Sequence, residues 1–161
     1  MIVGCGCRGR EVGRRLGSAG WEVRGTSRTV QGTKPIRAAG IEPAVADPEL
    51  AASILDHVAD VTIVFWLLGS AAGAPGAVAA IHGPRLERLL ERLVDTPVRG
   101  FVYEAAGTVD ERRLEEGGEI VRAAGERWRI PVALVTRDPG DLEPWTAAMA
   151  GAAARLTSGG A

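Results

Sequence analysis

Residues 2–28 read IVGCGCRGREVGRRLGSAGWEVRGTSR. Three glycines, Gly4, Gly6 and Gly9, have the spacing G-x-G-x-x-G, directly after an apolar run and just before a helical pattern. In a strand-to-helix turn, the first glycine permits the tight turn, the second lets a pyrophosphate approach the backbone, and the third lets the helix pack on the strand. This context favours a loop that binds phosphate. The alternative is a glycine-rich turn without a ligand, in a chain that has 22 glycines.

The start of the following helix offers unpaired N–H groups and the positive end of the helix dipole, which attract phosphates. The residues expected to contact the pyrophosphate of a dinucleotide are Gly4, Gly6, Cys7, Arg8 and Gly9. The only two cysteines, Cys5 and Cys7, are too close in sequence to form a good structural disulfide. We interpret them as small side chains that fill the loop; the alternative is a redox role, because a helix N-terminus lowers the pKa of a thiol.

A second signal lies about twenty residues after the loop, where sites that prefer NAD have an acid that binds the ribose 2′-hydroxyl. No acidic residue occurs between Glu22 and Glu42. Thr26, Ser27 and Arg28 offer hydroxyls and a guanidinium instead, which suit the 2′-phosphate of NADP. We therefore expect NADP, with NAD as the less favoured cofactor. The alternative for Arg28 is a solvated loop arginine.

Apolar runs alternate with helical patterns along the whole chain. The expected strands cover residues 2–5, 21–26, 41–46, 61–68, 98–103 and 131–136. The expected helices cover 10–19, 48–57, 86–94, 119–128 and 142–156, with 30–39 as a weak helix or loop and 69–76 as a loop. Asp47 is a candidate N-cap of the second of these helices. The alternation predicts an α/β fold, a doubly wound parallel β-sheet (Rossmann fold) of six strands with helices on both faces. It forms one domain over residues 1–156, with a frayed tail at 157–161.

The composition of the chain limits the kinds of partner that we expect it to bind. The 161 residues have a net charge of −1, so no overall basic field recruits nucleic acid. Residues 61–84 contain no Asp, Glu, Lys or Arg, but the apolar part is too short to cross a bilayer, so we expect a buried strand and no membrane contact. His57 and His82 belong to no cluster with the spacing of metal ligands, and we expect no metal. With no signal peptide visible, the expected location is cytoplasmic.

Taken together, these stretches resemble the atypical or extended branch of the short-chain dehydrogenase/reductase superfamily, the NAD-dependent epimerase/dehydratase type. The stretches that carry the resemblance are residues 4–9, 23–28, 61–69 and 130–139. The resemblance implies an NAD(P)-binding Rossmann domain. It also implies that Asp47, after the third strand, contacts the adenine, and that the end of the fourth strand lines the cofactor groove with Leu67, Leu68 and Gly69.

The chain departs from that family where the chemistry takes place. The family uses a Tyr-x-x-x-Lys pair, in which the lysine lowers the pKa of the tyrosine. Tyr103 is the only tyrosine and Gly107 follows four residues later, while Lys34 is the only lysine. Ala105 and Ala106 replace the Ser or Thr expected after the fifth strand. Without a nearby cation, we expect Tyr103 to titrate near its ordinary pKa of about 10.

Three functions remain open at this point. The first is an NADP-binding protein without the Tyr-x-x-x-Lys pair, with a binding or sensing role. The second is an NADP-dependent oxidoreductase or epimerase for a small carbonyl or nucleotide-sugar substrate, in which Tyr103, Glu104 and Thr108 are weak catalytic candidates and a second copy, as a homodimer, could contribute residues. The third is a scaffold whose nucleotide site is vestigial. The sequence names no substrate.

Overall fold

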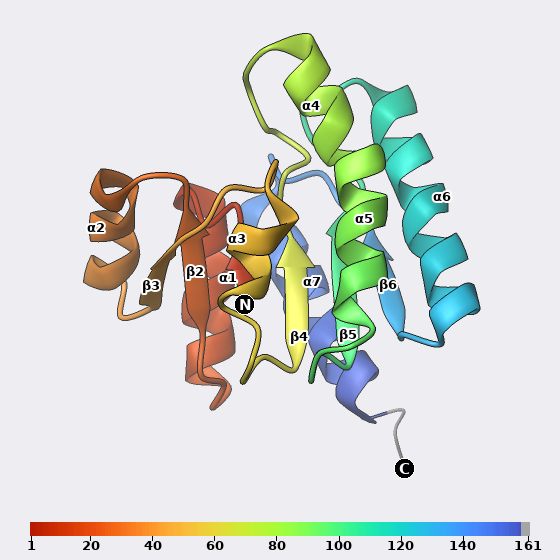
Figure 1. Cartoon of the computed structure of the whole chain (residues 1–161). Helices are drawn as coiled ribbons and strands as arrows, with labels where there is room; N and C mark the ends of the chain where they lie inside the picture. Colours follow the sequence, from red (N-terminus) through yellow and green to blue (C-terminus); the bar gives the residue numbers. More distant parts are fainter. Residues whose placement is uncertain (159–161) are drawn as a thin grey trace.

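A computed structural model describes residues 1–158 as one six-stranded sheet with helices on both faces (Figure 1). All strands run parallel, in the spatial order β3-β2-β1-β4-β5-β6. The strands are β1 (Ile2–Val3), β2 (Arg24–Ser27), β3 (Glu42–Val45), β4 (Ile63–Trp66), β5 (Gly100–Glu104) and β6 (Val132–Val135). This order confirms the predicted doubly wound Rossmann fold.

Seven helices cover the two faces of the sheet in the described part of the chain. They are α1 (Cys7–Ser18), α2 (Val30–Ala38), α3 (Ala51–Leu55), α4 (Pro75–Ile81), α5 (Pro84–Leu93), α6 (Glu111–Trp128) and α7 (Leu142–Ser158). Helices α3 to α6 pack on one face, and α1, α2 and α7 on the other. Figure 1 shows α5 and α6 in front of the sheet and α1 and α7 behind it.

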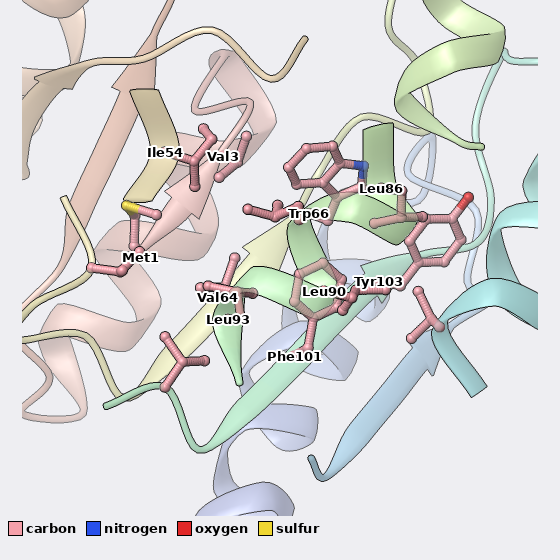
Figure 2. Packing of buried hydrophobic residues seen from close by; sticks show 14 of the residues in the cluster. Met1, Val3, Ile54, Val64, Trp66, Leu86, Leu90, Leu93, Phe101 and Tyr103 are labelled. Carbon is pink, nitrogen blue, oxygen red and sulfur yellow. The ribbon is translucent and has the colours of Figure 1, made fainter. Parts of the chain in front are cut away.

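Alternating side chains of the central strands form the two halves of the core. Along β4, Ile63 and Phe65 face the helices α1, α2 and α7, whereas Val64 and Trp66 face α3 to α6. This is the two-residue period of a strand, and both faces are apolar because both are covered. Figure 2 shows the second half of the core, where the labelled side chains of β4 and β5 pack against Leu86, Leu90 and Leu93 of α5.

The strand order reverses between β1 and β4, which are neighbours in the sheet although β2 and β3 lie between them in sequence. The connections from these two strands leave toward opposite sides of the sheet. In open α/β sheets, ligands bind in the crevice that this reversal leaves at the carboxyl ends of the strands. The loop with the three glycines follows β1 directly and therefore lies at this crevice.

Several element boundaries differ from the prediction. Helix α1 begins at Cys7, inside the glycine loop, so its N-terminus is closer to the crevice than expected. The segment predicted as a loop at 69–76 is only partly one, because Pro75 occupies the first turn of α4. Helix α3 is short, and Leu50 rather than Asp47 is its N-cap residue.

Helix α6 begins at Glu111, eight residues before the predicted start. The prediction treated Gly117 and Gly118 as a break, because glycine is a poor helix former. Both glycines are buried inside the helix. A Cβ at Gly117 would overlap the hydroxyl of Tyr103, and a Cβ at Gly118 would lie 2.8 Å from Leu134. The glycines therefore let α6 approach the sheet closely.

The predicted tail falls partly within the last helix, since Thr157 and Ser158 are helical residues of α7. Residues 159–161 lie outside the described residues. Within residues 1–158, no helix combines the length and apolar character needed to cross a membrane. The uncharged stretch at 61–84 instead supplies the buried strand β4, as predicted, together with α4.

Candidate functional site

A cavity of about 1040 Å³ opens at the carboxyl ends of the strands, at the upper end of the range for small-molecule sites. Its walls come from the segments after β1, β2, β3 and β4, from the end of β5 and from α7. The predicted cofactor residues that line it are Gly4, Gly6, Cys7, Arg8, Gly9, Thr26, Ser27, Arg28, Leu67 and Leu68. The fold thus brings residues from three separate segments of the chain to one space.

The three loop glycines differ in their conformation and in the space around them. Gly4 has φ +82°, a left-handed conformation that favours glycine, and a Cβ there would overlap the carbonyl oxygen of Leu67. A Cβ at Gly9 would lie 2.9 Å from the oxygen of Gly4, so this glycine lets α1 pack on the loop. A Cβ at Gly6 would meet nothing within 4 Å. Gly6 therefore faces the open space that an approaching pyrophosphate needs.

The N-terminus of α1 has no side-chain cap. Gly6 is its N-cap residue, so no side chain caps the first N–H groups, and the first turn contains no acid. The side chains of Arg8 and Arg10 also line the cavity. Unpaired N–H groups, the helix dipole and two guanidiniums together suit a pyrophosphate. Arg10 was not among the predicted contacts.

A second polar corner of the cavity lies where β2 ends. Ser27 and Arg28 line the cavity just before α2, whose first turn also has no acid. Thr29 caps α2, because its Oγ1 accepts a hydrogen bond from Gly32 N–H at 3.1 Å. The corner therefore combines a hydroxyl and an exposed guanidinium with the start of a helix. These are groups that suit a phosphate monoester.

The turn after β3 differs from the expectation for Asp47. Its carboxylate accepts a hydrogen bond from Glu49 N–H at 3.0 Å, and its own N–H donates to Ser53 Oγ at 2.8 Å. Asp47 thus closes the turn and does not line the cavity, while Ala46, Pro48 and Glu49 do. The turn predicted after the third strand therefore lies at the cavity, but it contributes the neighbours of Asp47 rather than Asp47 itself.

The segment after β4 forms an apolar wall. Leu67 and Leu68 line the cavity, but Gly69 does not, because it is buried against Glu104. The wall continues through the connecting segment into α4 with side chains that the prediction missed. They are Ser70, Ala71, Ala72, Ala74, Ala77, Val78 and Ile81. They were missed because residues 69–76 were predicted as a loop and no helix was predicted at the position of α4.

Glu104 is a carboxyl group inside the cavity. It ends β5, is only 3% exposed, and accepts a hydrogen bond from Gly69 N–H through Oε2 at 2.7 Å. Burial raises its pKa to about 7, although the Gly69 N–H and the nearby Arg8 guanidinium act in the opposite direction. Near neutral pH this carboxyl can therefore both donate and accept a proton.

Tyr103 lies in the core rather than in the cavity (Figure 2). Its hydroxyl is 2.7 Å from Nδ1 of the buried His82, whose Nε2 is 3.0 Å from Leu68 O. Burial, with Glu104 adding to the effect, raises the pKa of Tyr103 above its ordinary range, so the expected value of about 10 was wrong. Thr108 is exposed and does not line the cavity. Of the three weak catalytic candidates, only Glu104 is at the site.

The two cysteines differ in environment. Cys5 is buried, and burial raises its pKa to about 11, which disfavours the reactive thiolate. Cys7 is exposed at the start of α1, where its Sγ is 3.2 Å from a nitrogen of Arg10. Both thiols are free. In residues 1–158, no group of three or more His, Cys, Asp or Glu side chains is placed to hold a metal ion.

Trp145 is a cavity residue that the prediction missed altogether. It lies near the start of α7, is fully buried, and forms part of the cavity wall. Its Nε1–H has no hydrogen-bond partner among the described residues. Neither motif nor spacing marks it, because α7 reads in sequence as an ordinary alanine-rich helix.

Comparison with solved structures places this fold among known proteins. A short-chain dehydrogenase/reductase superfamily protein from Agrobacterium tumefaciens with bound NAD matches with a TM-score of 0.67 and 21% identity over 84% of this chain and 47% of that one. The Citrobacter sp. triphenylmethane reductase complexed with NADP(H) matches with a TM-score of 0.64 and 14% identity over 84% and 48%. The UDP-glucuronic acid 4-epimerase from Bacillus cereus in complex with NAD matches with a TM-score of 0.64 and 13% identity over 84% and 54%.

No family model matches the chain, and no curated protein does. The chain spans about half the length of the solved structures described above. At these identities the likeness establishes the fold and leaves the activity to be argued from the site. The chain has the Rossmann fold found in short-chain dehydrogenase/reductase and nucleotide-sugar epimerase structures, as the sequence motifs predicted.

Proposed function

We propose that this chain binds a nicotinamide dinucleotide in the cavity at the carboxyl ends of the strands. The observation that carries the proposal is the uncapped N-terminus of α1, which opens behind Gly6 onto a cavity of about 1040 Å³. A pyrophosphate fits this geometry, since Gly6 leaves the backbone accessible and Arg8 adds positive charge. The solved relatives with bound NAD or NADP(H) support a dinucleotide without distinguishing between the two.

We further propose that the cofactor is NADP. An NAD-preferring site needs an acid at the end of β2, and this corner has Ser27 and Arg28 instead. The nearby start of α2 adds a second helix N-terminus without an acid in its first turn. An additional phosphate would be favoured here by the same forces that favour the pyrophosphate at α1.

The proposed role is to bind or sense the cofactor without the chemistry of the Tyr-x-x-x-Lys pair. Tyr103 is buried under α6, whereas Lys34 lies on α2 at the other half of the sheet. The two side chains therefore cannot act together at one substrate within a chain. Since no other tyrosine or lysine exists in the sequence, the usual proton relay of the resembled family has no carrier here.

Glu104 favours a second candidate function, an NADP-dependent oxidoreductase or epimerase. When bound, the nicotinamide supplies hydride chemistry, and a substrate oxygen then needs a partner for its proton. The buried carboxyl of Glu104 lies in the cavity and can exchange a proton near neutral pH. A small carbonyl compound or a nucleotide sugar would be the substrate class.

Calorimetry with NADP, NADPH, NAD and NADH in parallel tests the proposal. We expect saturable binding of NADP and NADPH, at least ten times tighter than that of NAD and NADH, from the charged hydrogen bonds at the 2′-phosphate. Absence of binding by all four would contradict a dinucleotide site. Equal affinities would retain the dinucleotide and reject the assignment of NADP.

A further inference from the structure

Glu104 presents one of its two carboxyl oxygens to the cavity. Its Oε2 accepts a hydrogen bond from Gly69 N–H at 2.7 Å, which holds the side chain at the end of β5, while Oε1 makes no hydrogen bond within residues 1–158. In the same residues, Trp145 Nε1 is the only fully enclosed side-chain nitrogen or oxygen without a partner. Oε1 is therefore not enclosed, and since Glu104 lines the cavity, this oxygen is accessible from it.

The strand order determines which part of a dinucleotide would lie near Glu104. In the order β3-β2-β1-β4-β5-β6, the start of α1 follows β1, and the corner with Arg28 follows β2. A pyrophosphate at α1, with its adenosine half toward Arg28, directs the other half across β4 to the end of β5. Parallel strands lie about 4.8 Å apart, so the end of β5 is roughly 10 Å from that of β1, a distance that a nucleoside bridges. Glu104 thus lies at the nicotinamide end of the proposed site.

This end of the cavity has no positive charge of its own. Residues 61–84, which form the wall beside Glu104, contain no Asp, Glu, Lys or Arg. The other charged residues that line the cavity follow β1, β2 and β3; they are Arg8, Arg10, Arg28 and Glu49. Arg8 acts on the Glu104 carboxyl, but it lies on α1, where the proposed pyrophosphate would engage it. The Glu104 carboxylate is then the uncompensated charge at the nicotinamide end.

The other charged or titratable groups near Glu104 do not face the cavity. Tyr103 and His82 lie on the opposite face of β5, where they bond to each other. The charged residues before α6, after β6 and at the start of α7 are exposed and do not line the cavity; they are Asp110, Arg137, Asp138, Asp141 and Glu143. Among these groups, Glu104 alone can change charge at this end of the cavity.

A nicotinamide ring carries one positive charge when it is oxidised and none when it is reduced. In a site partly shielded from water, a carboxylate attracts the oxidised ring more strongly than it would in solvent. A protonated carboxyl has no such preference and suits the neutral, reduced ring. Burial raises the pKa of Glu104 to about 7, so both forms of the carboxyl are available near neutral pH.

We propose that Glu104 makes the cofactor site discriminate between the two redox states of the nicotinamide. Its carboxylate favours the oxidised cofactor, and binding of that form releases the proton that the carboxyl otherwise holds. The inference rests on the proposed dinucleotide site and needs no substrate. It gives the proposed sensing role a content, because above neutral pH the chain would respond to the oxidised cofactor rather than to the whole pool.

The first test is calorimetry of the full chain with NADP⁺ and with NADPH from pH 6 to 8.5. We expect the ratio of the two affinities, NADP⁺ over NADPH, to rise at least about fivefold over this range, since an opposite charge lowers the pKa of a carboxyl by about one unit or more. The 2′-phosphate also titrates, with a pKa near 6. Because both cofactors carry it, the ratio removes its contribution.

The second test counts protons. The same titrations at pH 6.5 in MES and in imidazole, buffers with different heats of ionisation, give the number of protons released on binding. Binding of NADP⁺ should release about half a proton more than binding of NADPH. A residue that only supports the fold would not produce this difference between two ligands of nearly the same shape.

A matched pair of variants assigns the effect to Glu104. Glu104→Gln keeps an acceptor for Gly69 N–H and removes the charge. Its affinity ratio should not change with pH, should be about tenfold below that of the parent at pH 8.5, and should be free of the extra proton release. Glu49→Gln removes the other carboxylate that lines the cavity, beyond β3, and should keep the pH dependence of the parent's ratio.

Three outcomes would overturn the inference: a ratio in the parent that does not change with pH, a pH dependence that survives in Glu104→Gln, or its loss in Glu49→Gln. If Glu104→Gln does not fold, the parent's ratio and proton release still decide. Binding of both cofactors at a constant ratio rejects the role of Glu104 and leaves the proposed function standing. Binding of neither cofactor rejects both.

Discussion

Of the three loop glycines, Gly6 is the position where an added side chain meets open space. Gly6→Val should therefore leave the fold intact, because nothing lies within 4 Å of the new Cβ and the backbone is not left-handed. The branched side chain would stand where a pyrophosphate must approach the start of α1. We expect NADPH binding to weaken at least a hundredfold, as measured by calorimetry, with an unchanged far-ultraviolet circular dichroism spectrum.

Gly17→Val is the matched control, since Gly17 lies in open space at the far end of the same helix. It should keep the NADPH affinity of the parent within about twofold. A folded Gly6→Val variant that binds NADPH as tightly as this control would show that the glycine loop does not bind the cofactor.

The proposed contact of Arg28 with the 2′-phosphate makes this residue the test of cofactor choice. Arg28→Ala should weaken the binding of NADPH by about 1.5–3 kcal/mol, the strength of a hydrogen bond to a charged group. The affinity for NADH should remain nearly unchanged. Arg37→Ala, an exposed position at the other end of α2, should change neither. Parallel titrations of the two variants measure the difference, and an equal loss for both cofactors in Arg28→Ala would refute a 2′-phosphate contact.

The pKa of Glu104 predicts a stability that depends on pH. Burial raises this pKa from 4.5 to about 7, so between these values the folded state holds a proton that the unfolded state has lost. The free energy of unfolding should fall as the pH rises through this range, by as much as about 3 kcal/mol. Glu104→Gln should lack this loss.

The measurement is urea denaturation of parent and Glu104→Gln from pH 4.5 to 8, analysed as the difference between the two. The difference matters because burial lowers the pKa of His82, which opposes the trend by destabilising the fold in acid. A constant difference between the variants at every pH would contradict the raised pKa of Glu104.

The loop glycines and the residues Thr26, Ser27 and Arg28 could be placed from sequence, because a phosphate loop and the end of β2 are local patterns that the fold repeats. Asp47 and Trp145 show the limit of such patterns. The carboxylate of Asp47 accepts a hydrogen bond from Glu49 N–H, a local contact that residue spacing does not encode. Trp145 reaches the cavity only because α7 crosses behind β5, a tertiary contact without a sequence motif.

Among the elements, α6 shows how packing overrides intrinsic propensity. Gly117 weakens the helix locally, yet a Cβ there would overlap the Tyr103 hydroxyl and lie 3.1 Å from His82 O. Gly117→Ala should therefore destabilise the protein by about 1–3 kcal/mol, the range for overpacking a core. Thermal unfolding measures the loss.

Gly151→Ala is the matched control in α7, where the new Cβ makes only an ordinary contact of 3.4 Å with the flexible Arg155 side chain. It should stabilise by about 0.5–1 kcal/mol, since alanine is the better helix former. If Gly117→Ala raised the melting temperature as Gly151→Ala does, the close approach of α6 to β5 would be wrong.

The balance between local propensity and packing also explains which helices and strands could be predicted from sequence. The strands lie near the predicted runs because an apolar stretch that is buried on both faces reads clearly as a central parallel strand. Helix α4 was missed, since Gly73 and Gly76 suggest a loop, while Pro75 sets the first turn of a helix. Because this helix was not predicted, the residues of α4 and of the segment before it that line the cavity were not predicted either.

At the scale of the whole molecule, the strand order determines which segments of the chain lie around the cavity. Only when β1 and β4 are neighbours do the glycine loop, the β2 corner and Glu104 surround one space. The doubly wound parallel sheet was predictable from six strands alternating with helices, whereas the order β3-β2-β1-β4-β5-β6 comes from the structure. The shape of the cavity was not, because it depends on side chains from six segments.

A backbone amide titration by nuclear magnetic resonance, with NADPH added to the ¹⁵N-labelled chain, locates the ligand directly. We predict that the largest shifts fall on residues 4–10 and 26–28, while amides near the amino ends of β4 and β5, such as Val61 and Val98, remain unshifted. We also expect NADPH to cause none of these shifts in Gly6→Val. In the parent, we expect NADH to shift the amide signals of residues 4–10 but not those of residues 26–28. Saturable shifts confined to other surfaces, or no shifts at millimolar NADPH, would contradict a dinucleotide site at the carboxyl ends of the strands.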